Sequence, residues 1–328
     1  MEGFGGRKCE SVRTVFFAVI LSLIFIPFWA QKSESAEIYS IKDDLNRTVT
    51  VSHPAVKIVC LDEAHAENIV ALRAVRQLTA VTDTASSKWV PKKIKRIAQN
   101  SSALQIAALE PDLVVMETDW AQGKKSLLDG LRKEGIPYAV FDEPHWGSFA
   151  LYLERLGTLT GRDKEADLAL ISSEKAMDKS AVRADSVENK SLFVICGADF
   201  STCAWDSWGA RIAATAGAKL ITDKDAPKKK DKRWIIDYGA AKFAQKAKNA
   251  DYIITLVNKS KGGKAISRAE IIGSPQFKNI KAVKLGQVFE VDESDFILPS
   301  LVRLDSSLVS CWQILNGVQP KKKIFPKI

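Results

Sequence analysis

The sequence lacks the short motifs that identify the common nucleotide-binding and hydrolytic enzymes. No G-x-G-x-x-G run follows a predicted strand, and no G-x-S-x-G run occurs. The segment Gly262-Gly-Lys-Ala265 lacks both the earlier glycine and the final Ser or Thr of a phosphate-binding loop. We therefore expect a protein that is not an enzyme and needs no cofactor. A metal hydrolase built on His65 and His145 is the remaining enzymatic alternative.

Cysteine is scarce, with five residues in 328, and no pair has the C-x-x-C spacing of a metal knuckle. Cys9 precedes the N-terminal apolar run, so it cannot be a lipoprotein acylation site. Cys60 and Cys196 lie in predicted apolar strands and are expected to be core residues. Cys203 lies in a predicted loop, and in an oxidising compartment it could pair with Cys196 or Cys311.

Acidic residues number 39 against 48 Lys and Arg, which gives a net charge of +9. Such a balance raises the question of a nucleic-acid partner. The basic residues, however, fall in three separate runs at 92–96, 228–233 and 321–323, and no nucleic-acid-binding motif accompanies them. We expect no nucleic-acid partner. These runs indicate solvated surface, or attraction to an anionic ligand or membrane face.

The N-terminus has the layout of a secretory signal. Arg7, Lys8 and Arg13 precede an uncharged apolar run at 15–30, which is short for a membrane span. We therefore expect a signal peptide over residues 1–36 and a periplasmic or otherwise extracytoplasmic protein. Cleavage after residue 30, 35 or 36 remains open, and retention of the segment as an anchor is the alternative.

The rest of the chain has the composition of a globular protein, and its pattern repeats one plan twice. It is 46% hydrophobic and 27% charged, and long enough for two cores of ordinary size. Strand, helix and strand are predicted at 58–61, 65–76 and 78–81, and again at 192–196, 208–216 and 219–221. The helices predicted at 104–109 and 240–247 each precede a further strand, at 113–117 and 252–256. Alternating strands and helices predict parallel sheets with a ligand crevice at the carboxyl ends of the strands.

Other segments complete the predicted architecture. Residues 38–51 alternate apolar and polar side chains across a turn and predict a β-hairpin. Residues 163–188 contain no proline or glycine and predict one helix of roughly 35 Å. Further elements are expected as a helix at 126–134 and strands at 138–141 and 288–291, with a last helix near 306–315.

These elements predict an α/β fold with two similar lobes, in which parallel sheets are flanked by helices and one long rigid helix bridges the lobes. We expect an N-terminal lobe over 37–145, a linker with the interlobe helix over 146–190, and a C-terminal lobe over 191–328. A cleft between the lobes is the expected ligand site.

Several ordered sequence elements resemble the periplasmic substrate-binding proteins of ferric-siderophore, haem and vitamin B12 ABC importers. They are Asp43-Asp-Leu-Asn-Arg-Thr-Val49, Lys57-Ile-Val-Cys-Leu61, Ile106-Ala-Ala-Leu-Glu-Pro-Asp-Leu-Val114, Leu156-Gly-Thr-Leu-Thr-Gly161 and Gly286-Gln-Val-Phe-Glu-Val291. The last leads to Asp295, Phe296 and Arg303. The resemblance covers nearly all of the chain after the signal. It implies a helical-backbone receptor whose lobes move little on ligand binding.

The resemblance also implies an ABC permease as partner, with one departure. The family docks through a glutamate on each lobe, but Leu104 occupies the first position and Lys242 lies nearest the second, with no Glu anywhere between 234 and 249. The docking glutamates are therefore missing. An orphan receptor or sensor that feeds no permease is an alternative, and a monomer is expected in either case.

Aromatic residues are concentrated after predicted strands, where loops should line the cleft. Aromatic rings suit a bulky ligand with flat or apolar faces, since each ring buries a large area. Some of them could equally be core residues. The predicted aromatic ligand contacts are Trp89, Trp120, Trp146, Phe200, Trp205, Trp208, Trp234 and Phe296. By resemblance, Trp89, Trp234 and Phe296 match positions that contact ligand in B12 binders.

Polar candidates accompany these rings. His65 and His145 fall near predicted cleft loops, and imidazole with carboxylates could ligate a metal ion or a haem iron. We include His145 among the ligand contacts, keep His65 as a weak metal candidate, and otherwise expect no metal site in the protein itself. Arg233 is predicted to pair with an anionic group of the ligand, and Arg303 could do the same or form a structural salt bridge.

The sequence therefore predicts an exported binding protein that captures a metal chelate in an interlobe cleft and delivers it to an ABC importer. A ferric siderophore is the first expectation for the ligand. A corrinoid (vitamin B12) or haem in the same role is the alternative.

Overall fold

The computed structural model describes residues 39–86, 88–187, 189–229, 234–257 and 265–320. The described residues all belong to one compact unit, residues 37–328. The predicted signal peptide lies outside the described residues. No helix within the described ranges is long and apolar enough to cross a membrane.

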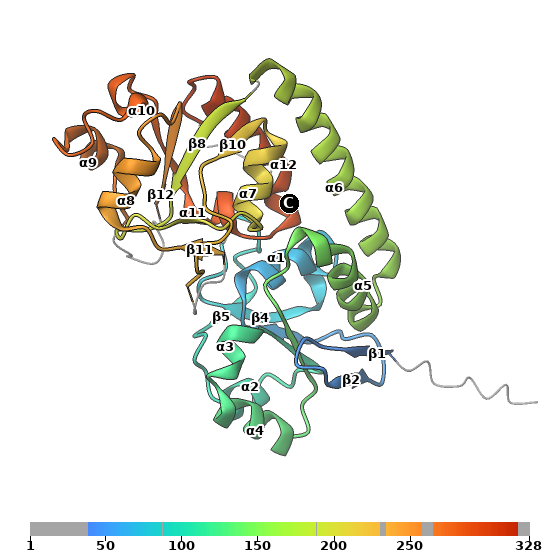
Figure 1. The fold of residues 1–328 in the computed structure, drawn as a ribbon. Helices are drawn as coiled ribbons and strands as arrows, with labels where there is room; N and C mark the ends of the chain where they lie inside the picture. The colour runs from blue at the N-terminus through green and yellow to red at the C-terminus, as the bar shows by residue number, and fades with distance from the viewer. Residues whose placement is uncertain (1–38, 87, 188, 230–233, 258–264, 321–328) are drawn as a thin grey trace, which may run out of the picture. The chain divides into compact units, whose positions relative to one another are not determined.

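The first lobe is built on a five-stranded parallel sheet with the strand order β5-β4-β3-β6-β7 (Figure 1). Its central strands are buried apolar runs, as expected for a sheet covered on both faces. Val59 pairs with Val114 in the middle of the sheet. The strands are β3 (Ile58–Cys60), β4 (Leu78–Thr82), β5 (Lys95–Ile97), β6 (Leu113–Glu117) and β7 (Tyr138–Phe141).

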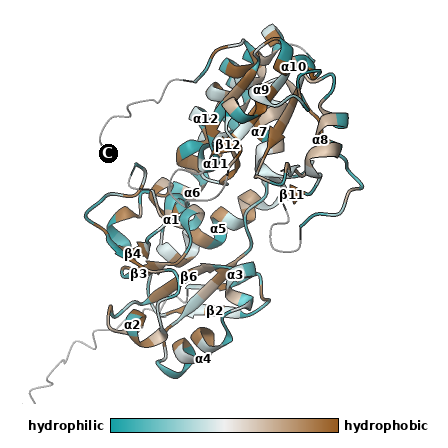
Figure 2. Ribbon diagram, turned by 90° about the vertical axis from the view of Figure 1, so that its left-hand side faces the viewer, coloured by the Kyte–Doolittle hydropathy of each residue, from teal (hydrophilic) through white to brown (hydrophobic). Residues whose placement is uncertain are grey.

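The second lobe repeats this plan with a four-stranded parallel sheet in the order β10-β8-β12-β13. A separate antiparallel pair of short strands, β9 and β11, lies in the same lobe. The strands are β8 (Lys190–Ile195), β9 (Thr202–Cys203), β10 (Ala218–Leu220), β11 (Ile235–Ile236), β12 (Tyr252–Val257) and β13 (Val288–Asp292). The hydrophobic colouring of Figure 2 follows the strands of both sheets.

Helices cover both sheets. They are α1 (Glu63–Ala71), α2 (Ala103–Ala107), α3 (Thr118–Gln122), α4 (Lys125–Lys133), α5 (Phe149–Thr160), α6 (Asp163–Ala184), α7 (Trp208–Thr215), α8 (Gly239–Lys246), α9 (Arg268–Gly273), α10 (Lys281–Lys284), α11 (Glu293–Ile297) and α12 (Leu301–Leu315). Within the described ranges, some of them are joined by short 3₁₀ turns, namely η1 (Val75–Gln77), η2 (Trp146–Ser148) and η3 (Asp185–Val187). These elements confirm the predicted α/β fold class.

The two lobes repeat each other down to single side chains. Asp112 precedes β6 and accepts a hydrogen bond from the backbone N–H of Lys57, just before β3, at 3.0 Å. Asp251 precedes β12 and accepts one from the backbone N–H of Ser191 in β8, at 2.8 Å. Each aspartate therefore ties the start of one central strand to the next. The predicted internal repeat is confirmed at the residues that set this register.

The core is continuous from one lobe to the other. On one sheet face Val59 packs with α4, while Ile58 on the opposite face joins a cluster shared with α1 and α5. That same cluster contains Val194 of the second sheet, Met177 of α6 and Leu308 of α12. Because alternate residues of a strand point to opposite faces, each sheet contributes one face to this shared core. A shared core restrains movement of the lobes.

Helix α6 spans 22 residues, or roughly 33 Å at 1.5 Å per residue. It begins after Gly161, whose φ of +63° ends α5 in the left-handed conformation. It packs against α5 and α12 and runs along both lobes in Figure 1. Near its C-terminal end, Trp312 Nε1 donates to the carbonyl oxygen of Arg183 at 3.1 Å. The bridging helix is confirmed, but it ends at Ala184 and continues to 187 only as the turn η3.

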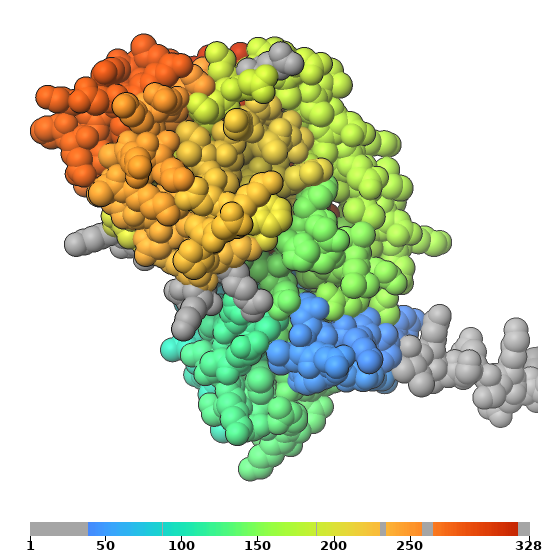
Figure 3. Space-filling model, viewed as in Figure 1, coloured from blue at the N-terminus to red at the C-terminus, as the bar shows by residue number. Residues whose placement is uncertain are grey.

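The predicted hairpin is confirmed as strands β1 (Tyr39–Lys42) and β2 (Thr48–Val51), which pair antiparallel. Asp43 stabilises the turn by accepting hydrogen bonds from the backbone N–H groups of Leu45 and Arg47. Asn46 adopts φ +58°, a conformation that asparagine tolerates better than most residues. The hairpin, coloured blue, lies on the surface of the first lobe in Figure 3.

Three local expectations differ from the structure. The last helix begins at Leu301 rather than near Ser306, and Arg303 in its first turn pairs with Glu67. The helix expected at 65–76 ends at Ala71 and is followed by the turn η1. Cys203 lies in the buried strand β9 rather than in a loop.

Candidate binding pocket

A pocket of about 420 Å³ lies between side chains of both lobes. Its first wall follows strands β6 and β7, and its second wall comes from the segments around α7 and β11. The pocket thus lies beyond the carboxyl ends of parallel strands, where α/β sheets bind their ligands. Its lining residues are Glu117, Asp119, Asp142, Glu143, Pro144, His145, Trp205, Asp206, Ser207, Trp208, Lys228 and Trp234.

The first wall is acidic because two strands end in carboxylate-rich segments. Glu117 ends β6, and its side chain caps α3 by accepting the N–H groups of Asp119 and Trp120, both at 2.8 Å. Burial raises the pKa of Glu117, and the two N–H groups oppose that shift. The segment after β7 is held where the backbone N–H of Asp142 donates to Asp44 Oδ2 at 2.7 Å. Arg155 forms an ion pair with Asp44 at 2.6 Å.

The second wall presents three indoles. Ser207 caps α7, since its hydroxyl accepts the backbone N–H of Ala210 at 3.1 Å, and this places Trp208 at the first helical position. Trp205 lies two residues before this cap and is 48% exposed. Trp234 directly precedes β11, and its carbonyl oxygen accepts a hydrogen bond from the N–H of Ala204 at 2.7 Å, which holds it next to the segment after β9. Short strand pairing therefore brings together indoles that are 29 residues apart in the chain.

A second set of rings supports Trp208 from behind. The ring centroids of Trp146 and Phe149 lie 5.4 and 5.3 Å from that of Trp208. The guanidinium carbon of Arg211 lies 5.5 Å from the Trp146 ring centroid. Trp208 is buried as a result. Packing thus preorganises Trp208 within the aromatic wall.

The described lining is strongly acidic in balance. It carries five carboxylates and one lysine, besides His145. The lysine, Lys228, pairs with Asp206 at 2.5 Å, so these two charges offset each other. The remaining carboxylates are Glu117, Asp119, Asp142 and Glu143, so the described part of the lining is acidic although the chain as a whole is basic.

Four of the ten predicted contacts line this pocket: His145, Trp205, Trp208 and Trp234. Five others pack elsewhere, namely Trp89, Trp120, Trp146, Phe200 and Phe296. Arg233 lies outside the described residues. Ligand contact stays a prediction for all ten, but the geometry favours the first four.

The aromatic residues outside the pocket have structural partners. Phe200 packs on Phe243 with ring centroids 5.0 Å apart and adopts φ +57°. Phe296 is buried against Gly209 of α7. Trp89 is buried, with the guanidinium carbon of Arg303 5.8 Å from its ring centroid. Trp120 is partly buried against the α4 side of the first sheet.

His65 is fully buried, and its Nδ1 forms a hydrogen bond with the Tyr152 hydroxyl at 2.9 Å. Desolvation by burial lowers the pKa of His65, so the imidazole is neutral at physiological pH. Within the described ranges, no group of three or more His, Cys, Asp or Glu side chains is arranged to hold a metal ion. The structure gives His65 a packing role in the core of the first lobe.

The carboxylates of the first wall were not among the predicted contacts. Glu117, Asp142 and Glu143 directly end or follow two predicted strands, and that position is a signal the sequence contains. The signal does not say which loop residues turn toward the cleft. Asp206 and Lys228 had no signal of this kind, because they meet only through the fold of the second lobe.

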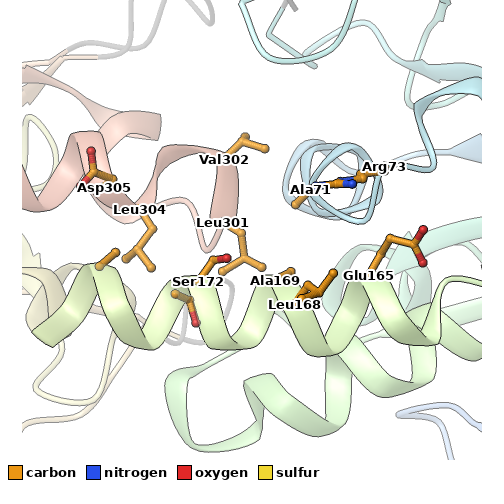
Figure 4. Close-up of a pocket in the computed structure, with 12 residues that line it drawn as sticks. Ala71, Arg73, Glu165, Leu168, Ala169, Ser172, Leu301, Val302, Leu304 and Asp305 are labelled. Atoms are coloured by element: carbon orange, nitrogen blue, oxygen red, sulfur yellow. The ribbon is translucent and has the colours of Figure 1, made fainter.

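A second depression, of about 290 Å³, lies among α1, α6 and α12 (Figure 4). The residues around it include Ala71 at the end of α1, Arg73 just beyond it, Leu168 of α6 and Leu301 of α12. It is smaller than the pocket between the lobes and lies along helices rather than at the ends of strands. Its geometry therefore does not match the ligand crevice of a parallel sheet.

Solved structures with this fold include several binding proteins. The petrobactin-binding protein YclQ of Bacillus subtilis matches with a TM-score of 0.68 at 17% identity, covering 85% of this chain and 99% of that one. Helicobacter pylori CeuE in a complex with Ni-His has a TM-score of 0.66 at 18% identity, covering 86% and 89%. An Fe3+-hydroxamate transport protein of Saccharomonospora viridis has a TM-score of 0.65 at 13% identity, covering 85% and 99%. These likenesses establish the fold.

No curated protein sequence matches the chain. The family model described as periplasmic binding protein matches residues 58–294, which takes in both sheets and the bridging helix. The match covers the strands whose ends form the pocket, as well as the helix that links the lobes. With this match and the two-lobed fold, the chain belongs to the periplasmic binding protein family.

Proposed function

We propose that this protein captures a metal chelate in the pocket between its lobes and delivers it to an ABC importer. The observation that carries the proposal is the pocket itself, in which Trp205, Trp208 and Trp234 face a wall of carboxylates beyond the ends of β6 and β7. Indoles bury large areas of a flat or apolar ligand at low entropy cost. The family membership supports a binding role outside the cytoplasm.

The charge of the lining narrows the ligand class. A ferric complex of three hydroxamates is neutral, whereas a ferric complex of three catechols is an anion. Carboxylates in the described lining favour a neutral or positively charged ligand group over an anionic one. We therefore favour a neutral or cationic ferric siderophore, such as a trihydroxamate with a free amine that could approach Asp142.

Haem or a corrinoid in the same role is the second candidate. The observation in its favour is His145, an exposed imidazole in the pocket wall that could ligate a metal with an open axial position. Haem carries two carboxylates of its own, which the acidic lining would disfavour. The siderophore is therefore the better match.

The ABC permease is proposed as the partner because of the transport role, since no docking residue supports it. At the positions where the resemblance leads us to expect glutamates, Leu104 is 70% exposed on α2 and Lys242 pairs with Asp223 at 3.3 Å. A permease would have to recognise a different surface from the usual acidic pair. An orphan receptor of the same fold remains the alternative, and an uptake assay with the cognate permease separates the two.

A fluorescence titration of the purified exported protein tests the proposal. A ferric trihydroxamate should quench tryptophan emission in a saturable way, and the iron-free compound should bind more weakly. A ferric tris-catecholate, haemin and cyanocobalamin serve as competitors, with N-acetyltryptophanamide as the control for light absorption by the ligand. Tighter binding of the catecholate would contradict the charge argument. Saturable binding of none of the four would contradict the chelate role.

A further inference from the structure

Two buried cysteines of the second lobe lie in contact. Cys196 Sγ and Cys203 Sγ are 3.4 Å apart, and both side chains are almost fully inaccessible. Cys60 is elsewhere in the core of the first lobe, where its thiol donates to the carbonyl oxygen of Asp62 at 3.3 Å. Among the described residues, the sulfur contact is therefore specific to one pair.

The backbone around this pair brings the sulfurs together. Cys196 directly follows β8, and its N–H donates to the carbonyl oxygen of Ser201 at 2.8 Å. Between them the chain makes a compact turn, in which the Asp199 side chain accepts the N–H of Ser201 at 3.1 Å. Phe200 in this turn adopts φ +57° and packs its ring into the core. The turn is thus fixed by hydrogen bonds and packing that do not involve the sulfurs.

The pair lies directly beneath the aromatic wall of the pocket. A Cβ atom placed on Gly209 of α7 would lie 3.1 Å from Cys203 Sγ, so the helix that carries Trp208 rests on this sulfur. Cys203 also pairs with Ile235 across β9 and β11, next to Trp234. A bond that holds Cys203 in place would therefore also hold α7 and β11, which position Trp208 and Trp234.

We propose that Cys196 and Cys203 form a disulfide in the exported protein. The two thiols lose two protons and two electrons, and the electrons pass to an oxidising protein disulfide, which becomes a dithiol. One thiolate attacks that disulfide to give a mixed disulfide, and the second thiolate displaces the oxidant and closes the S–S bond. Disulfides persist in the compartment where periplasmic binding proteins act.

The bond forms before the second lobe is fully packed. Burial raises the pKa of Cys196 well above that of an exposed thiol, so in the folded protein the reactive thiolate is scarce. In the folding chain, six residues separate the cysteines and keep the sulfurs close. Once closed, the bond fastens β9 to the end of β8 and preorganises the wall formed by Trp205 and Trp208.

Peptide mapping of the exported protein tests the bond. The full-length chain is expressed in a host that exports it, recovered, unfolded in denaturant with an alkylating agent, and digested with trypsin. The fragment at 191–211 contains both cysteines and should carry no alkyl group and be lighter by two hydrogen atoms than its reduced form. Further cleavage after Phe200 should leave two cross-linked peptides. A fragment with two alkyl groups in the absence of reductant would overturn the proposal.

Thermal unfolding supplies a second readout with matched variants. Reduction should lower the Tm of the wild-type protein by on the order of 5 °C. The variant with both Cys196→Ala and Cys203→Ala should not respond to reductant, whereas Cys311→Ala, which removes another buried cysteine, should keep the full response. Equal responses of wild type and double variant to reductant would also contradict the disulfide.

Discussion

Arg303 on α12 donates two parallel hydrogen bonds to Glu67 on α1, from Nε to Oε2 at 2.6 Å and from Nη2 to Oε1 at 2.5 Å. Both side chains are buried, and the pair joins the second lobe to the first. Glu63 and Asp295 also contact the guanidinium, at 3.1 and 2.7 Å. The sequence allowed Arg303 either a ligand contact or a structural salt bridge, and the structure shows the salt bridge.

Replacing Arg303 with Met should destabilise the protein by about 3–5 kcal/mol, because Glu67 would remain buried without its partner. Urea unfolding followed by circular dichroism measures this loss. The exposed pair Lys57–Glu110 provides the control, since Lys57→Met should change stability by about 1 kcal/mol or less. A similar small effect at Arg303 would contradict the structural role of the pair.

The stability of the second lobe should fall in acid through Asp251. Partial desolvation acts to raise the pKa of Asp251, but hydrogen bonds from Lys281 and Ser191 prevail and hold it at about 2, below the ordinary 3.8. The folded state therefore binds this proton less tightly than the unfolded chain. The contribution is fully present above about pH 4 and is lost as the pH falls toward about 2.

Asp251→Asn should consequently lower the urea midpoint at pH 6, and the gap to wild type should narrow toward pH 2. Urea titrations at several pH values measure the two curves, with Asp129→Asn on the exposed surface of α4 as the control. A gap that stays constant with pH would show that Asp251 acts through its shape and not its charge.

Removing one indole from the pocket should weaken chelate binding without unfolding the protein. Trp205 is the suitable position because it is half exposed, whereas Trp208 is packed into the core. Trp205→Ala should weaken binding by about 1–3 kcal/mol, the range for a contact of this size. Calorimetry measures the affinity, and Trp312→Phe, at a tryptophan that bonds to α6, is the control. Unchanged affinity in Trp205→Ala would remove this indole from the site.

Ligand binding should leave the overall dimensions of the protein nearly unchanged. Helix α6 is continuous over 22 residues, and the hydrophobic core runs from one sheet through α6 to the other. Small-angle scattering of the free and chelate-bound protein should therefore give radii of gyration that agree closely. A clear decrease on binding would indicate a hinge that the shared core does not allow.

The fold could be predicted from the sequence where apolar runs are long and bounded. Strand β7 has the predicted bounds. Strands β6 and β12 coincide with the apolar runs that follow Asp112 and Asp251, where strands were predicted. Strands β9 and β11 were missed because each has two residues, too few for a periodic pattern. Their pairing depends on contacts between distant segments, and it is this pairing that positions Trp234.

The site was only partly predictable for a related reason. Aromatic residues after strands, such as Trp205 and Trp146, carry the same local signal, yet one lines the pocket and the other stacks on Phe149 behind it. Contacts between distant segments, such as that of Phe149 with Trp208, decide between these roles. The acidic wall forms because β6 and β7 are neighbours in the sheet, so that the carboxylates at their ends meet. A single sequence does not give this order of strands.

The position of the metal in a crystal of the complex tests the proposed binding pocket most directly. Crystals grown with a ferric trihydroxamate and measured at the iron absorption edge give an anomalous peak at the iron. We expect this peak in the pocket between Trp205 and Trp234 on one side and Asp142 on the other. A peak in the depression along α6, or saturable binding in solution with the iron located outside this pocket, would contradict it.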